Sequence, residues 1–277
     1  MPRSRVLSLA SVLLFVPGAA ACQTLYTASQ DDITLRVVDP ATAATLSAIA
    51  ITMDGEAISN VTGLATDPID QQLYAVMRLV GTGGSTLAVL DPATGVATRV
   101  GDMDEKIAGI AFSCEGLYGV TGDGSDTPET LFRINKGNGA LTLVAPLGRG
   151  DDGEALGFNP LDGMLYHASG HTGAYDPESG YGVIFERVDP ADGTTTDIPL
   201  DPKSPLLDEE AQALTWYEAF GAFLWKQEHG PGTLYLVSTD GTAFLIGYPD
   251  HYAKGLAFVP TFRCSSDIFR DGFEDTP

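Results

Sequence analysis

The sequence is poor in the residues on which most enzyme classes depend. Its 277 residues include only three cysteines and four histidines. No His-Glu-x-x-His spacing occurs, and there is no Gly-x-Ser-x-Gly elbow, no phosphate-cradling Gly-rich loop with lysine and no Cys-x-x-Cys pair. A zinc hydrolase of the first kind is therefore excluded, and a haem or redox role has no support.

Long apolar runs are also scarce. The apolar run 6–16 follows Arg3 and Arg5 and is followed by the small residues 19–21. This order is that of a secretory signal peptide, predicted here over residues 1–21. No later segment approaches the roughly 20 apolar residues that a membrane helix needs, so we expect an exported mature chain without a transmembrane segment.

Basic residues are the third shortage. Lysine and arginine total 15 against 37 acidic residues, and removal of residues 1–21 moves the formal charge from −22 to −24. Such a surface repels nucleic acid and anionic lipid, and it favours either cations or simple solubility. The remaining length is compatible with one large all-β domain.

What the sequence does contain is a repeat. A Gly-Leu-Ala-Phe-like element occurs five times, and an apolar-aromatic pair such as Leu73-Tyr74 follows about ten residues later in four copies. The five copies of the first element begin at Gly63, Gly109, Ala155, Ala213 and Gly255. Apolar strands ending in Asp-Pro or other turn residues follow, which gives four short strands per unit. This pattern is typical of propeller blades.

The repeat also accounts for both chain ends. Residues 63–101, 109–145, 155–199 and 213–248 each supply a whole unit. The fifth unit takes its first strand, a, from 255–260 and strands b, c and d from about 24–53. We therefore predict an all-β protein, a single five-bladed β-propeller over 22–264, closed by its N-terminal strands. A β-sandwich with irregular spacing is the alternative.

The cysteines are assigned from their place in the repeat. Cys22 and Cys264 both fall at the a–b turn of the shared blade, whereas Cys114 falls at that turn in a blade that is not its neighbour. A Cys22–Cys264 disulfide would staple the ring, leaving Cys114 unpaired. Alternatively, residues 19–22 are a lipobox and Cys22 is acylated, although Ala19 stands where leucine is usual.

Two resemblances follow from these motifs. The repeat is similar to that of secreted bacterial β-propellers with a Gly-Leu-Ala-Phe, Leu-Tyr and Asp-Pro-x-Thr-Gly cadence, over roughly residues 24–260. Such propellers include binding proteins, scaffolds and unrelated enzymes, so the resemblance implies architecture and not activity. The acidic tail 265–277 contains Ile268-Phe269 and Asp271-Gly272-Phe273-Glu274, and resembles a tail of exported gammaproteobacterial proteins. It implies an extracellular, periplasmic or cell-envelope location, or else it is a frayed terminus.

The loops joining strand d to the next strand a carry acids in every blade, and all open on one face. Converging carboxylates could bind Ca²⁺ or form an acid and base pair, or they could be a solvated rim. The metal-ligand candidates are Asp104, Asp151, Asp152, Glu154, Asp208 and Glu210. The catalytic candidates are Glu154, Asp152, Glu210 and His251. Glu154 could also pair with Lys254 across the channel.

The longest b–c loop, 169–182, opens on the same face. Its His171, Tyr175 and Tyr181 are the candidate binding residues for a sugar or peptide, although the loop could equally be an insertion. The leading functional prediction is an exported, non-catalytic propeller that binds a protein, glycan or small molecule. The alternative is a calcium-assisted hydrolase or lyase with its carboxylates at the channel mouth.

Overall fold

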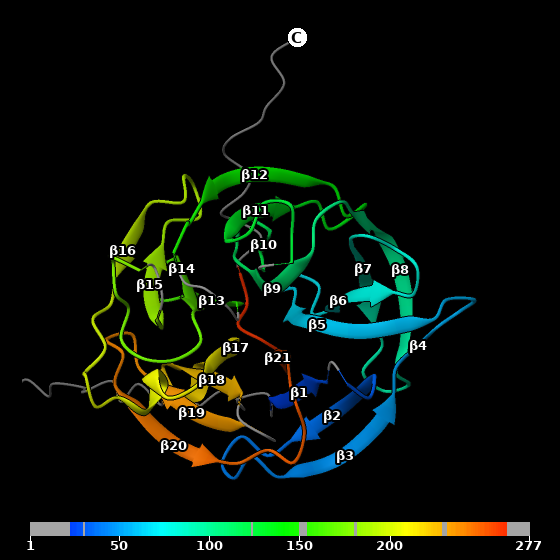
Figure 1. Ribbon diagram of the computed structural model, residues 1–277. Helices are drawn as coiled ribbons and strands as arrows, with labels where there is room; N and C mark the ends of the chain where they lie inside the picture. The colour runs from blue at the N-terminus through cyan, green and yellow to red at the C-terminus, as the bar shows by residue number, and fades with distance from the viewer. Residues whose placement is uncertain are drawn as a thin grey trace, which may run out of the picture.

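The computed structural model describes residues 23–29, 31–122, 124–149, 154–179, 182–228 and 232–264. The predicted signal peptide, Cys22, the tail 265–277 and the candidates Asp151, Asp152 and Tyr181 lie outside these ranges. Within them the chain forms five sheets around a central axis (Figure 1), antiparallel apart from one added parallel strand, with two short 3-10 helices, Pro205–Leu207 and Glu218–Phe220. None of the described helices is long and apolar enough to cross a membrane.

The strands fall into five blades, numbered here in chain order. Blade 1 consists of β5 (Ile58–Thr66), β6 (Leu73–Leu79), β7 (Ser85–Leu90) and β8 (Val96–Met103), with β4 (Thr52–Met53) added parallel to β8. Blade 2 consists of β9 (Ile107–Phe112), β10 (Leu117–Thr121), β11 (Thr130–Ile134) and β12 (Leu141–Pro146). Blade 3 consists of β13 (Glu154–Asn159), β14 (Met164–Ser169), β15 (Ile184–Val188) and β16 (Thr195–Asp197). Blade 4 consists of β17 (Glu210–Tyr217), β18 (Ala222–Glu228), β19 (Thr233–Val237) and β20 (Ala243–Gly247). Blade 5 consists of β21 (Gly255–Val259), β1 (Thr24–Ala28), β2 (Thr34–Val38) and β3 (Thr45–Ala50).

Both chain ends contribute to blade 5, as the repeat predicts. Strand β21 pairs with β1 in antiparallel register from Thr24↔Val259 to Ala28↔Gly255. The five-bladed propeller is therefore confirmed, and the sandwich alternative is excluded. Closure leaves no open end at which a blade would lack a neighbour.

Two features of the repeat have a direct physical cause. A Cβ at Gly255 would lie 2.9 Å from the Leu64 backbone nitrogen, so the innermost strands approach too closely there for a side chain. In the Asp-Pro-x-Thr-Gly turn, Asp91 accepts hydrogen bonds from the Ala93 N–H and the Thr94 hydroxyl. Gly95 closes that turn with φ of +75°, which favours glycine.

The predicted aromatic residues pack between blades. Tyr74 of blade 1 meets Phe112 of blade 2 with ring centroids 5.2 Å apart, and Tyr166 of blade 3 meets Phe223 of blade 4 at 4.7 Å. These contacts confirm that the aromatic pairs of the repeat are packing residues. They bury large apolar areas where neighbouring sheets meet.

The central channel is filled by side chains of the innermost strands. The free volumes along it are about 30 Å³ and about 10 Å³, which leaves room for only a few water molecules. Leu64, Leu156 and Leu256 line both spaces. The axis of the ring is therefore an apolar core and not a passage.

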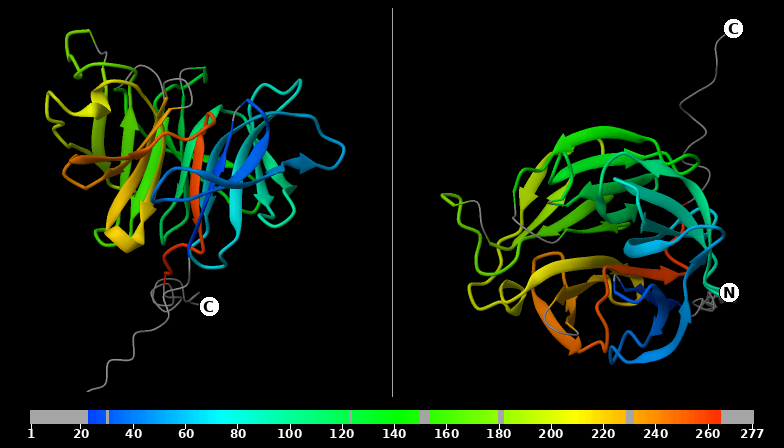
Figure 2. Two further views of the ribbon diagram at one scale, coloured as in Figure 1. Left: turned by 90° about the horizontal axis from the view of Figure 1, so that it is seen from below. Right: turned by 45° about the vertical axis from the view of Figure 1, so that its right-hand side comes forward.

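The segment after β21 closes one end of this core. Thr261 donates its N–H to Gln71 Oε1 at 2.8 Å, and the Phe262 ring lies 5.5 Å from that of Phe158 in blade 3. In the left view of Figure 2, the red segment that follows β21 lies at the end of the ring opposite the long loop of blade 3. Residues 260–264 thus lie at that end of the ring, in contact with blades 1 and 3.

This path corrects the predicted disulfide. Cys264 is bonded to Cys114 of blade 2, with a Cα–Cα distance of 5.5 Å, so the Cys22–Cys264 pairing is wrong. The prediction considered only neighbours around the ring. Because the channel is narrow, a few residues after β21 suffice to reach a blade that is not adjacent to blade 5.

Candidate functional site

Those predicted acidic residues of the d–a loops that the structure describes do not converge into one site. Asp104 and Asp208 are exposed on different blades, while Glu154 and Glu210 are buried at the starts of β13 and β17. Across the described residues, no three Asp, Glu, His or Cys side chains are placed to hold a metal ion. No observation there favours the calcium-assisted alternative.

Other acids near this rim form hydrogen bonds and ion pairs with nearby segments of the chain. Glu105 accepts hydrogen bonds from the Ser125 hydroxyl, the Thr127 hydroxyl at 2.9 Å and the Asp126 N–H at 3.2 Å, all in the b–c loop of blade 2. Arg99 pairs with Glu56 at 2.8 Å, and with Asp102 of its own strand. The rim acids are therefore partly structural.

Glu154 belongs to a buried chain of polar side chains in blade 3. His167 on β14 contacts Glu154 Oε2 through Nε2 at 2.6 Å and Glu186 Oε1 on β15 through Nδ1 at 2.9 Å. Ser169 donates its hydroxyl to Glu154 Oε1 at 3.2 Å. His167, Ser169 and Glu186 are completely buried and Glu154 is 2 % exposed, so these groups satisfy one another in place of water.

The two carboxyl groups that flank His167 favour its protonated, cationic form. Burial opposes its charge, but the hydrogen bonds to Glu154 and Glu186 raise the pKa of His167 to about 10. Burial likewise opposes ionisation of Glu186, yet His167 and Arg149 hold its pKa below the ordinary value. Burial prevails at Glu154 and raises its pKa.

Arg149 extends this chain to the outer edge of the blade. Its Nη2 donates to Glu186 Oε2 and to Asp197 Oδ1, the last residue of β16. The polar line thus runs from the innermost strand through β14 and β15 to the outermost strand. Asp197 is 66 % exposed in its side chain and Arg149 25 %, so only this outer end meets solvent.

A cavity of about 270 Å³, called the blade-3 cavity, lies at that outer end. Its apolar walls are Ala174, Val183, Ile184, Phe185, Ile198, Pro199, Leu200 and Leu207, and its polar side chains are Arg149, Tyr175 and Asp197. The Tyr175 ring centroid lies 5.8 Å from Arg149 Cζ. Of the predicted binding residues, Tyr175 therefore lines a cavity, whereas His171 is exposed on the same loop.

A larger cavity of about 490 Å³ lies on the opposite face, between blades 1 and 2. It is bordered by Cys114, Arg133 and Lys136. Lys136 is held by Asp67, which is 1 % exposed, and lies 3.3 Å from Asp70 Oδ2. Lys136 is thus paired with two carboxylates, and Arg133 donates to the Glu115 carbonyl oxygen at 2.6 Å. Among the described residues, no chain of buried polar side chains like that of blade 3 leads to these two groups.

Glu210 and Lys254 form a pair at the channel mouth. Lys254 Nζ lies 3.6 Å from Glu210 Oε1. The interpretation that Lys254 pairs with Glu154 across the channel is therefore wrong. Glu154 turns into its own blade towards His167, and Lys254 reaches the neighbouring blade instead.

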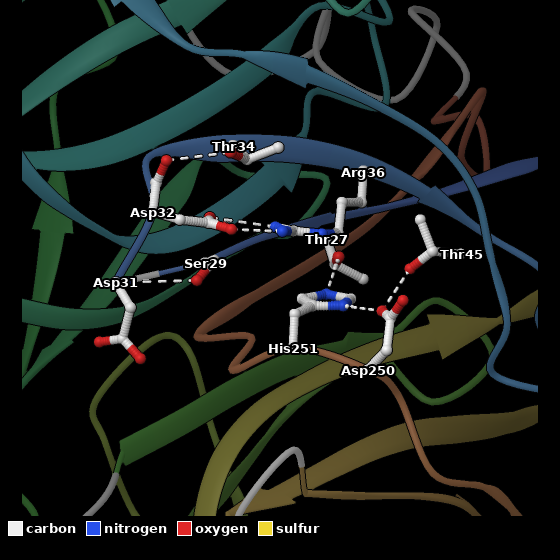
Figure 3. A network of polar contacts seen from close by, with 9 residues as sticks. All are labelled: Thr27, Ser29, Asp31, Asp32, Thr34, Arg36, Thr45, Asp250 and His251. Atoms are coloured by element: carbon white, nitrogen blue, oxygen red, sulfur yellow. Dashed lines mark hydrogen bonds and ion pairs between the residues drawn. The ribbon is translucent and has the colours of Figure 1, made fainter.

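His251 lies between β20 and β21 and joins a different network in blade 5 (Figure 3). Its Nε2 lies 2.6 Å from Thr27 Oγ1, and its Nδ1 lies 3.0 Å from Asp250 Oδ1. Thr45 donates its hydroxyl to the same Asp250 oxygen at 2.6 Å. Burial lowers the pKa of His251, although Asp250 opposes this.

The order hydroxyl, imidazole, carboxylate is that of a nucleophile, its base and the group that orients the base. Thr27 is 3 % exposed and His251 7 %, however, and Thr27 lies within β1, between β21 and β2. A substrate could reach Thr27 only if the 248–254 segment moved. The arrangement is better described as a set of hydrogen bonds that holds the 248–254 segment against the N-terminal blade strands.

Sequence reasoning missed His167, Glu186 and Arg149. A signal for His167 is present, because the residue after each apolar-aromatic pair occupies an equivalent place in strand b. Those residues are Thr27, Ala75, Gly119, His167 and Lys226. An ionisable side chain at a buried repeat position requires a partner, and Glu186 stands opposite His167 in the register.

Comparison with known proteins supports the fold and does not identify a function. No family model matches the chain, and no curated protein matches it in sequence. A chain in the crystal structure of a nidogen/laminin complex is similar with a TM-score of 0.56 and 12 % identity, covering 87 % of this chain and 100 % of that one. A protein of unknown function from Bacteroides caccae is similar with a TM-score of 0.51 and 10 % identity, covering 86 % and 99 %. The class defined by the fold is that of the β-propellers, which does not specify a function.

Proposed function

We propose that the protein is a binding module and that its ligand occupies the blade-3 cavity. We further propose that the protein is exported. The observation that carries this proposal is the lining of the cavity, in which mostly apolar side chains are combined with Arg149, Tyr175 and Asp197, the usual form of a small-molecule site. The filled channel offers no comparable space. The ligand is a small molecule or a side chain or terminus of a larger partner.

Export is supported by three features. Residues 1–21 have the order of a signal peptide, the tail resembles those of exported proteins, and the Cys114–Cys264 disulfide suits an oxidising compartment. We place the protein in the periplasm, the cell envelope or the extracellular space. Expression with its own leader in a Gram-negative host tests this, because intact-mass measurement should give an exported chain beginning at or near Cys22. Retention of Met1 in a cytoplasmic fraction would contradict export.

Binding is tested with three probes that share a phenylalkyl body and carry an anionic, a neutral or a cationic head group: 3-phenylpropionate, 3-phenylpropanamide and 3-phenylpropylammonium. In methyl-labelled protein, Ile184 and Ile198 report from the cavity walls. We expect at least one probe to shift these methyl signals saturably, and Ala174→Trp to abolish the shift by filling the space. The matched control is Leu143→Trp, at an exposed position on β12 of blade 2. If no probe shifts the cavity methyls, the proposal fails.

A further inference from the structure

We propose that the blade-3 cavity recognises a carboxylate carried on an apolar body, and that Arg149 binds this carboxylate in exchange for Asp197. This inference rests on the proposed function of the cavity and adds the chemical class of its ligand. The carboxylate could belong to a free organic acid or to the C-terminus of a peptide.

The first argument is the way in which Arg149 is held. Its Nη2 is anchored by Glu186, which is completely buried and is itself fixed by His167, with Glu154 behind it. Removing three ionisable groups from water is costly unless each is paired, and all three serve to position one guanidinium at the cavity edge. A guanidinium fixed in this way is pre-organised to bind an anion.

The second argument is the donor capacity that remains. Among the described residues, all hydrogen bonds of the Arg149 side chain are made by Nη2, so Nη1 and Nε keep their N–H groups for a ligand. Tyr175 lies near the guanidinium and limits the directions from which an acceptor can approach. With respect to the described part of the chain, the arginine is thus held at Nη2 only.

The third argument concerns Asp197. It contacts Arg149 from the end of β16, yet its side chain is 66 % exposed. A ligand carboxylate that replaces it leaves the local charge unchanged, and the displaced Asp197 returns to water without being buried. Ion pairs with an exposed partner contribute little to stability, so replacing Asp197 by a ligand carboxylate has a small cost in free energy.

The walls determine the rest of the ligand. Beyond Arg149, Tyr175 and Asp197 the lining is aliphatic or aromatic, with Phe185 and Leu207 both buried. A sugar would bring several hydroxyl groups into a space that offers them few partners, whereas an alkyl or aryl group gains from burial there. A volume of about 270 Å³ limits that group to the size of a small acid or one side chain.

The test compares the three phenyl probes, together with the dipeptide acetyl-Ala-Phe with a free or an amidated C-terminus. We expect 3-phenylpropionate to bind about tenfold or more tightly than its amide, as a charge-assisted contact requires. Arg149→Lys should weaken the acid by about tenfold, because lysine cannot reproduce the fixed guanidinium. Asp197→Asn should tighten it severalfold, because the competing carboxylate is removed. Arg187→Gln, on the exposed side of β15, is the matched control and should change nothing.

The outcomes separate the two proposals. Equal binding of acid and amide, or weaker acid binding in Asp197→Asn, would overturn the carboxylate assignment while leaving the cavity as a binding site. Tightest binding of the ammonium probe would also overturn it and make Asp197 the recognition group. Failure of every probe would overturn the proposed function itself. Preference for the free dipeptide over 3-phenylpropionate would identify a peptide terminus as the source, and the reverse order a free acid.

Discussion

Blades 1 and 2 differ from blade 3 at one equivalent position in the middle of the sheet. In blade 1 that position pairs Ala75 with Ala88, and in blade 2 it pairs Gly119 with Phe132. In blade 3 it pairs His167 with Glu186, and Glu154 and Arg149 continue the ionic contacts on either side. The same backbone register therefore holds either an apolar layer or a line of charges.

This comparison shows which feature needs a functional explanation. The apolar blades demonstrate that the fold is satisfied by small and apolar side chains at this position. A buried ionic chain is seldom more stabilising than a well-packed apolar layer, so stability alone does not account for the one in blade 3. The group that this ionic chain holds in place is the guanidinium of Arg149, at the edge of the blade-3 cavity.

The largest expected effect comes from breaking the ionic chain at its centre. His167→Leu leaves Glu154 and Glu186 buried without their shared partner, and we expect a loss of about 3–5 kcal/mol in the free energy of unfolding. Chemical denaturation followed by fluorescence measures this loss. The triple variant with Glu154→Leu and Glu186→Gln should recover much of it, as the apolar layers of blades 1 and 2 imply. A single variant as stable as the wild type would contradict the importance of the chain.

A smaller effect is expected at the covalent contact that blade 2 has and blade 3 lacks. The disulfide joins Cys114 to Cys264 over a sequence separation of 150 residues. Cys114→Ser with Cys264→Ser should lower the free energy of unfolding by about 2–4 kcal/mol, because the unfolded chain gains freedom. Hydrogen exchange should accelerate more in β9 and β10 than in β13 and β14. Uniform acceleration across both blades would show that the bond acts on the ring as a whole.

The two histidines should give pH dependences of opposite sign. The pKa of His167 is raised to about 10, so its contribution is complete below about pH 6.5 and is lost as the pH rises towards 10. The pKa of His251 is lowered by burial, so stability is lost as the pH falls below about 6.5. Each proton changes the free energy of unfolding by at most about 1.4 kcal/mol per pH unit.

Denaturation at a series of pH values separates these contributions. The triple variant, in which His167→Leu is combined with Glu154→Leu and Glu186→Gln, should flatten the alkaline limb, because it leaves neither the histidine nor an unpaired buried carboxylate, and should keep the loss that His251 causes below about pH 6.5. His251→Gln should do the reverse, because glutamine keeps a hydrogen bond to Thr27 or Asp250 without titrating. An alkaline limb that persists in the triple variant would show that other groups are responsible for it.

The architecture could be predicted from the repeat because the same packing requirements select similar residues in each of the five blades, at positions such as those of Gly255 and Tyr74. The site was less predictable, since each functional contact occurs once. The position of His167 directly after an apolar-aromatic pair of the repeat could indicate that it is buried, but not that Glu186 and Arg149 meet it. The disulfide was missed for a related reason: ring order says nothing about a segment that crosses the channel.

The smallest expected effect lies at the rim of blade 2, where Glu105 serves a loop and no cavity. Glu105→Ala removes three hydrogen-bond contacts to 125–127, but the groups released are near solvent, so the free energy of unfolding should fall by less than about 1 kcal/mol. Amide exchange at Asp126 should nevertheless accelerate, because its N–H loses its acceptor. Asp126→Ala is the matched control, since it keeps that N–H and its contact with Glu105. If Glu105→Ala instead lowers stability as much as His167→Leu does, the rim acids are structural to the same degree as the blade-3 chain, and the argument that this chain is exceptional fails.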